Sequence, residues 1–75
     1  MASYSVLIKR SAAKEIEALP LEDRRRVVAR IQTLGGDPRG EGCEKLSGEE
    51  KYRVRQGDYR ILYEITDTEL IVTVV

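Results

Sequence analysis

The sequence contains no histidine, no tryptophan and no phenylalanine, and it has a single cysteine, Cys43. Histidine is the commonest metal ligand and the commonest general acid or base, so its absence removes the usual metal sites and catalytic pairs. One cysteine cannot form an internal disulfide, and it has no second thiol with which to hold a metal. The sequence therefore predicts a protein with no metal and no cofactor.

Long apolar runs are also missing. No stretch approaches the ~18 apolar residues of a membrane span. Charged residues interrupt the first twenty positions at Lys9, Arg10, Lys14 and Glu15, so the apolar segment of a signal peptide is not present there. These features, together with the lone cysteine, predict a cytoplasmic protein that does not associate with membranes.

What remains is a short, charged chain. Its 75 residues are 41% hydrophobic and 35% charged, a composition typical of a globular protein. A chain of this length buries only about 60% of the surface that it exposes when unfolded, so we expect one domain, residues 1–75, with two layers around a small core.

The charge is balanced overall but not locally. Thirteen basic residues match thirteen acidic ones. Between Lys51 and Arg60, however, there are four basic residues and one acid, Asp58. A neutral protein can thus carry a basic stripe, and the local potential governs contact with a phosphate.

The first half of the chain predicts a strand and two helices. Alternating apolar residues indicate a strand over Ser3–Arg10. Ser11 is the expected N-cap of a first helix, and Pro20 is expected to end this helix or to begin the next one. An apolar stripe with helical spacing predicts a second helix over Leu21–Leu34, and Gly35-Gly36 is the expected stop.

The second half predicts a loop followed by strands. Residues 37–50 have the composition of a loop, which Leu46 is expected to anchor to the core. From Lys51 the apolar period becomes two, and tight turns are expected at Gly57-Asp58 and Asp67-Thr68. The predicted strands are 51–56, 59–65 and 70–75. The expected fold is α+β, a helical hairpin packed on a small antiparallel β-sheet in the order β-α-α-β-β-β.

A two-residue turn at Gly57-Asp58 fixes the register of the hairpin. Directly opposed residues share a face of the sheet, so one face should carry an apolar set that packs on the helices: Tyr52, Val54, Ile61 and Tyr63. The other face should carry a mainly basic set: Lys51, Arg53, Arg55, Arg60 and Leu62, with Glu64 beside Lys51.

Arg55 then stands opposite Arg60, with Arg53 two residues away on the same face. Like charges across a strand pair cost roughly 0.2–1 kcal/mol. Three guanidinium groups in one place are reasonable if an anion binds there, because the planar fork of arginine suits phosphate. The alternative is that these arginines are simply solvated on an open face.

The hairpin segment from Tyr52 to Tyr63 (YRVRQGDYRILY) resembles the central signature of RelE/ParE-superfamily toxins. The stretch Lys45-Leu46-Ser47-Gly48 is similar to the K-L-x-G of that family, and A-x-K-E-I-x-x-L-P over 12–20 resembles its first helix. The resemblance covers almost the whole chain.

This resemblance implies a microbial-ribonuclease-like fold and a toxin that cuts messenger RNA on the ribosome. In such toxins a 2′-hydroxyl attacks the adjacent phosphate. By position, Arg53, Arg55 and Arg60 match the basic residues that bind the RNA backbone and stabilise the charge that develops on the phosphorus centre. The implied partners are a cognate antitoxin, the ribosome and messenger RNA.

The resemblance is incomplete at the C-terminal end. Family members continue past the strand that ends here at Val75, into a segment with further catalytic groups. The chain is therefore interpreted as C-terminally truncated, and we expect weak or absent nuclease activity, because lost proton transfer costs about 10²–10⁴-fold in rate.

Several alternatives stay open from the sequence. The same fold serves a ParE-like poison of DNA gyrase, or a remnant that only binds its antitoxin. Lys51 and Tyr59 are further candidates for RNA binding, although Tyr59 equally suits the end of a strand. The arginines of the second helix, 24–26 and 30, are interpreted as a solvated face that is partly paired with acids.

Overall fold

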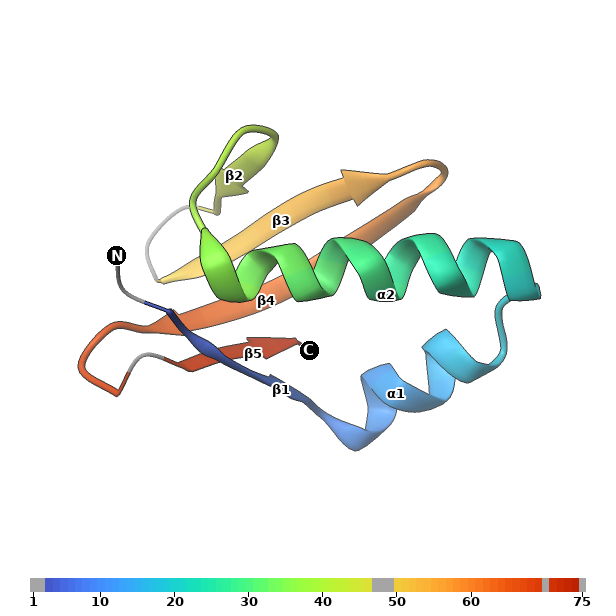
Figure 1. The fold of residues 1–75 in the computed structure, drawn as a ribbon, viewed down its shortest axis with the longest axis horizontal. Coiled ribbons are helices and arrows are strands. Elements are labelled where there is room, and N and C mark those ends of the chain that lie inside the picture. Colours follow the sequence, from blue (N-terminus) through green and yellow to red (C-terminus); the bar gives the residue numbers. More distant parts are fainter. Residues whose placement is uncertain (1–2, 47–49, 70, 75) are drawn as a thin grey trace.

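The computed structural model describes residues 3–46, 50–69 and 71–74. Two helices lie on one side of a five-stranded sheet (Figure 1). The elements follow in the order β1 (Ser5–Ile8), α1 (Arg10–Glu17), α2 (Leu21–Gly36), β2 (Cys43–Lys45), β3 (Lys51–Gln56), β4 (Tyr59–Thr66) and β5 (Ile71–Val74). The predicted fold, a helical hairpin on a sheet, is confirmed. The ends predicted for the last strand, 70 and 75, lie outside the described residues.

The strands are arranged in the order β1-β5-β4-β3-β2. The pairs β2–β3, β3–β4 and β4–β5 are antiparallel, as local hairpin connections require. β1 pairs with β5 in parallel, with Ser5 opposite Ile71. The sheet is thus antiparallel except at this one edge, which the sequence did not predict.

β2 lies within the segment that was predicted as a loop. Its three residues, Cys43–Lys45, pair with Val54, Arg53 and Tyr52 of β3. Three residues are too few to show an alternating pattern, which is why the prediction missed them. Leu46 continues this pairing, because its N–H donates to the carbonyl of Lys51 at 2.8 Å. Leu46 is half-buried and is not part of the buried core, so the anchoring role predicted for it was wrong.

The start of α1 also differs from the prediction. The helix begins at Arg10, and Lys9 rather than Ser11 precedes its first turn. Lys9 has an extended backbone, and its carbonyl accepts the N–H of Ala13 at 2.9 Å. β1 therefore passes into α1 with no separate loop and no side-chain cap.

α2 runs through Gly35 and Gly36, two residues beyond the predicted end. A Cβ at Gly35 would lie 3.1 Å from the carbonyl oxygen of Tyr4 and 3.2 Å from a methyl group of Val6. The same close approach lets the carbonyl of Gly35 accept the N–H of Tyr4 at 2.7 Å. Because glycine has no side chain at position 35, β1 can pack directly against the end of α2.

The core lies between the helices and the sheet. Tyr63 is fully buried, and its ring stacks on Tyr52 with a centroid distance of 5.8 Å. The Tyr63 hydroxyl donates to the carbonyl of Pro38 at 2.6 Å, which joins the loop after α2 to the sheet. The buried apolar residues are Ala12, Val27, Ile31, Leu34, Tyr52, Val54, Ile61, Tyr63 and Ile65.

Arg39 holds the same loop at the end of the sheet. Its guanidinium donates to both carboxylate oxygens of Asp67, at 2.9 and 2.8 Å, and to Glu50 at 2.9 Å. Its Nε donates to the hydroxyl of Tyr52 at 2.9 Å, and the hydroxyl of Tyr4 donates to Asp67 at 2.7 Å. The Arg39 fork and the Tyr4 hydroxyl lower the pKa of Asp67 to about 2.

Within these described segments, none of the helices combines the length and the apolar character that crossing a membrane demands.

Candidate functional site

The β3–β4 hairpin has the register that the sequence predicted. Gln56 pairs with Tyr59, and Arg55 pairs with Arg60 directly beyond it. Gly57 has φ of 62°, a left-handed conformation that glycine adopts without a steric penalty. The two-residue turn therefore sets which side chains share a face.

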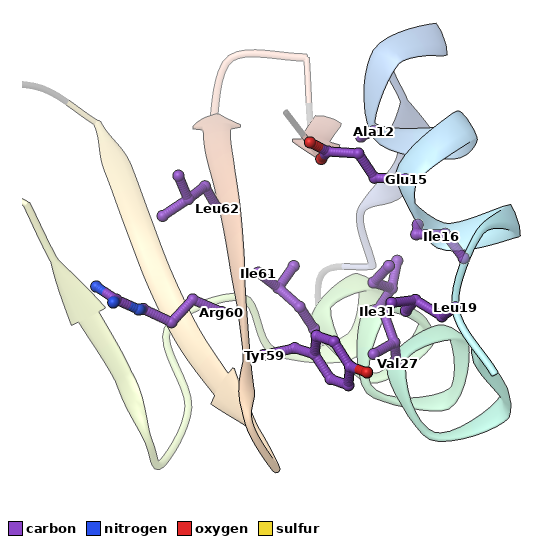
Figure 2. Close-up of a pocket in the computed structure, with 10 residues that line it drawn as sticks. All are labelled: Ala12, Glu15, Ile16, Leu19, Val27, Ile31, Tyr59, Arg60, Ile61 and Leu62. Atoms are coloured by element: carbon purple, nitrogen blue, oxygen red, sulfur yellow. The ribbon is translucent and has the colours of Figure 1, made fainter. Parts of the chain in front are cut away.

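Alternate residues of the hairpin project to opposite sides of the sheet. Figure 2 shows Tyr59 and Ile61 of β4 pointing toward the helices, whereas Arg60 and Leu62 point away from them. We call the side away from the helices the outer face. Its hairpin residues are Lys51, Arg53, Arg55, Arg60, Leu62 and Glu64.

A hollow of about 360 Å³ opens on this outer face. The structure brings together there the three arginines that the sequence singled out, beside the glycine that precedes β2 and the acid in the middle of β2. The residues that line this arginine hollow are Gly42, Glu44, Arg53, Arg55 and Arg60. Its positive side chains come from two adjacent strands, so the sheet itself fixes their spacing.

Arg53 is paired within the hollow. Its Nη2 donates to Oε2 of Glu44 at 2.7 Å, across the β2–β3 pair in which the two residues are direct partners. This hydrogen bond, together with the charges of Arg53 and Arg55, lowers the pKa of Glu44 below its usual value. A carboxylate thus already sits where arginine would hold an anion.

Arg55 and Arg60 are different. Among residues 3–46, 50–69 and 71–74, no carboxylate lies within 4.0 Å of either guanidinium group. Both side chains are exposed, and they stand directly opposite each other in the sheet. Two unpaired like charges side by side form a site that a phosphate would stabilise.

The two other residues predicted for RNA binding lie elsewhere. Lys51 is on the outer face but at the far end of the hairpin, opposite Glu64. Tyr59 is on the helix side, where its hydroxyl donates to Asp23 of α2 at 3.1 Å. Tyr59 therefore does not share the outer face with the arginines, because odd and even positions of β4 face opposite ways, and RNA binding by Tyr59 stays a prediction.

The arginines of α2 only partly follow the prediction of a paired, solvated face. Arg25 is exposed and lies 3.5 Å from Glu22, as expected. Arg24 and Arg30 are instead half-buried and donate to backbone carbonyls, those of Leu19 at 3.4 Å and Glu41 at 3.0 Å. Arg30 thereby supports the loop that leads into β2.

A second pocket, of about 280 Å³, lies on the helix side between α1, α2 and β4 (Figure 2). Its lining is mainly apolar and includes Ile16, Leu19 and Ile61. Among the described residues, Glu15 and Arg60 are the charged members of this lining, and the Arg60 side chain points away from the helices. It gathers no cluster of reactive groups. In the described part of the chain there is likewise no group of three or more cysteine or acidic side chains placed to hold a metal ion. The arginine hollow is thus the candidate functional site.

Sequence comparison identifies the family of this chain. Residues 6–75 match the sequence model of the ParE toxin of the type II toxin–antitoxin system parDE. The chain belongs to this family. It is a toxin of the RelE/ParE superfamily, as the hairpin signature predicted. No curated protein matches the sequence.

Solved structures of RelE proteins resemble this toxin closely. The RelBE2 toxin–antitoxin complex of Mycobacterium tuberculosis matches with a TM-score of 0.85 and 27% identity, over 96% of this chain and 91% of that one. A mutant of the E. coli toxin RelE in the free state matches with a TM-score of 0.81 and 26% identity, over 100% and 80%. The archaeal RelE–RelB complex of Pyrococcus horikoshii shares the fold, with a TM-score of 0.83 at 24% identity over 96% and 89%.

Sequence reasoning missed Glu44, the acid of the candidate site. Glu44 lies in the segment 37–50 that the sequence predicted as a loop. The hairpin register alone could not reveal it, because its partner Arg53 lies across a second, shorter strand pair. The pair Glu44-Lys45, where the stretch K-L-S-G begins, forms no sequence motif that predicts a binding site.

Proposed function

We propose that this toxin is a RelE-like, ribosome-dependent endoribonuclease that cuts messenger RNA and thereby inhibits translation. The arginine hollow would bind the RNA backbone at the point of cleavage. The observation that carries the proposal is the pair Arg55 and Arg60, which stand opposite each other with no acidic partner in the described part of the chain.

The chemistry of the hollow suits a phosphate that gains charge. When a 2′-hydroxyl attacks the adjacent phosphorus, negative charge grows on the non-bridging oxygens. Fixed guanidinium donors aimed at these oxygens stabilise that charge without reorganisation. Arg55 and Arg60 would fill this role, and Arg53 would join them when it leaves Glu44.

Over the part of the chain that the structure describes, the arginine hollow has few groups that could transfer a proton during cleavage. The chain has no histidine. Among the described residues that line the hollow, Glu44 is the one acid, and Arg53 favours its charged form by lowering its pKa. Because general acid–base groups contribute about 10²–10⁴-fold, we expect this chain to cut slowly.

The test is cleavage of messenger RNA during translation in a reconstituted system. Arg60→Ala should lower the cleavage rate by about 10²-fold, as loss of one charge-stabilising donor does. Arg25→Ala, which removes an arginine from the exposed face of α2, is the matched control and should leave the rate unchanged. Equal rates for the native chain and Arg60→Ala would reject the arginine hollow as the cleavage site.

A second candidate function is a ParE-like poison of DNA gyrase. The match of residues 6–75 to the ParE toxin family favours it. Inhibition of gyrase supercoiling by the native chain, without messenger-RNA cleavage, would select this function. Inhibition that survives Arg55→Ala and Arg60→Ala would show further that the arginine hollow takes no part in it.

We also propose a cognate antitoxin as the protein partner of this toxin. The Mycobacterium tuberculosis and Pyrococcus horikoshii structures are toxin–antitoxin complexes, which supports such a partner. Ribosome-dependent activity would place the toxin in the cytoplasm. Co-expression with the neighbouring reading frame and co-purification would test the pairing.

A further inference from the structure

The outer face carries a second hollow beside the arginines. Its volume is about 300 Å³. Its apolar side chains on the outer face are Leu46 and Leu62, with two lysines and an acid around them, because the rings of Tyr52 and Tyr63 are buried toward the helices. The residues that line this leucine hollow are Lys9, Leu46, Lys51, Tyr52, Leu62, Tyr63 and Glu64.

The two hollows adjoin at one strand pair. Arg53, which lines the arginine hollow, is the direct partner of Leu62, which lines the leucine hollow. Opposed Cβ atoms lie about 5 Å apart. Leu62 is also two residues from Arg60 along β4, a spacing of about 7 Å on one face.

Leu62 is 41% exposed on this open face and lines the same hollow as Leu46, so the apolar surface is a small patch and not a single exposed leucine. Leu46 approaches the same hollow from the end of β2 and is half-buried. This apolar surface is bordered by two lysines and Glu64, and it adjoins two arginines that have no acidic partner among the described residues. Such a surface matches a ligand with a flat apolar group next to a phosphate.

We propose that the leucine hollow is a base-binding subsite for single-stranded RNA, and that it takes the base of the nucleotide whose phosphate binds Arg55 and Arg60. The inference rests on the proposed function, since it names how the same site would hold its substrate. A ribose joins base to phosphate in a nucleotide, and the two hollows likewise adjoin, at the Arg53–Leu62 pair. On the far side Lys9 lies 4.0 Å from Glu64, and Lys51 is the direct strand partner of Glu64. Two lysines therefore outnumber one acid among the described residues where the strand would continue.

These contacts do not select one RNA base over another. Leu46 and Leu62 offer apolar area, and area alone accepts any base. The subsite should therefore orient a nucleotide on the sheet while leaving the choice of base weak.

The test uses the full chain labelled with ¹⁵N, titrated with a 2′-O-methylated trinucleotide, which cannot be cut. A second trinucleotide lacks the central base and keeps all the phosphates. Amide shifts locate each ligand, and their concentration dependence gives each Kd. Leu62→Ala removes the apolar floor, and Leu21→Ala removes an exposed leucine at the start of α2 as the control.

The proposal requires that Leu62→Ala weaken binding of the intact trinucleotide by roughly three- to tenfold and leave binding of the abasic one unchanged. Leu21→Ala should change neither. Leu62→Ala acting equally on both ligands, or on neither, would overturn the base subsite.

A separate variant distinguishes failure of the subsite from failure of the proposed function. Arg55→Ala could weaken binding of both trinucleotides while Leu62→Ala affects neither. The phosphate site would then be supported, and the leucine hollow would bind a protein partner and not a base. If Arg55→Ala changes neither affinity, or neither ligand shifts any amide of β3 or β4 at millimolar concentration, both proposals fall together.

Discussion

Glu44 and Arg53 form a 2.7 Å ion pair at the place where the proposed function needs a phosphate. Both residues line the arginine hollow, and they face each other across the β2–β3 pair. A phosphate that enters this hollow must compete with the Glu44 carboxylate for Arg53, and it is also repelled by that carboxylate. Glu44 therefore limits how tightly the hollow can hold an anion.

Glu44→Gln should tighten binding of the 2′-O-methylated trinucleotide, because it removes the competing charge and keeps the size of the side chain. An exposed ion pair is weak, so we expect a gain of roughly two- to fivefold. Glu41→Gln makes the same charge change in the preceding loop, outside the hollow, and should have a smaller effect. Weaker binding by Glu44→Gln would mean instead that Glu44 holds Arg53 in the position that binds phosphate.

The stability of the protein should fall in acid through Asp67. Its pKa in the folded protein is about 2, below the ordinary 3.8, because Arg39 and Tyr4 donate hydrogen bonds to the charged carboxylate. A lowered pKa stabilises the fold at pH values above about 4, and this stabilisation is lost as the pH falls from there through 2. Circular dichroism melts between pH 7 and pH 2 should show that loss.

Asp67→Asn should lower Tm at pH 7 by a few degrees and should flatten the decline between pH 4 and pH 2, because its amide cannot ionise. Asp58→Asn, at the exposed turn of the hairpin, is the matched control and should keep the native pH profile. An unchanged acid profile in Asp67→Asn would show that the hydrogen bonds of Asp67 with Arg39 and Tyr4 do not cause the loss of stability in acid.

Removing one buried hydroxyl should loosen the loop after α2. Tyr63→Phe deletes the 2.6 Å hydrogen bond to the carbonyl of Pro38 and leaves that carbonyl buried without its donor. We expect a loss of about 1–2 kcal/mol in the free energy of unfolding, measured by urea denaturation. Tyr59→Phe loses a half-buried hydroxyl bond to Asp23 and should cost less. Equal losses in the two variants would contradict the importance of the Pro38 contact.

The parts of the fold that the sequence predicted are those set by local rules. Gly57-Asp58 fixes a two-residue turn, and that turn alone determines every pair of the β3–β4 hairpin, including Arg55 opposite Arg60. The helical hairpin followed in the same way from apolar spacing and from Pro20. The sequence thereby predicted that the three arginines of the candidate site share one face of the sheet.

The parts that were missed depend on contacts between distant segments. The parallel pairing of β1 with β5 joins Ser5 to Ile71, and no local pattern encodes it. Arg39 was treated as a loop residue, yet it meets Asp67, 28 positions away. The register of the hairpin also implied that Tyr59 shares a face with Ile61 and not with Arg60, as the structure shows.

The alternation along β3 and β4 has a consequence for how such a protein can change. Val54 and Ile61 hold the interior together, while their immediate neighbours Arg53, Arg55, Arg60 and Leu62 meet the solvent. Substitutions at the solvent-facing positions leave the interior contacts in place. A new ligand preference can therefore arise through single exchanges on a scaffold whose folding does not depend on them.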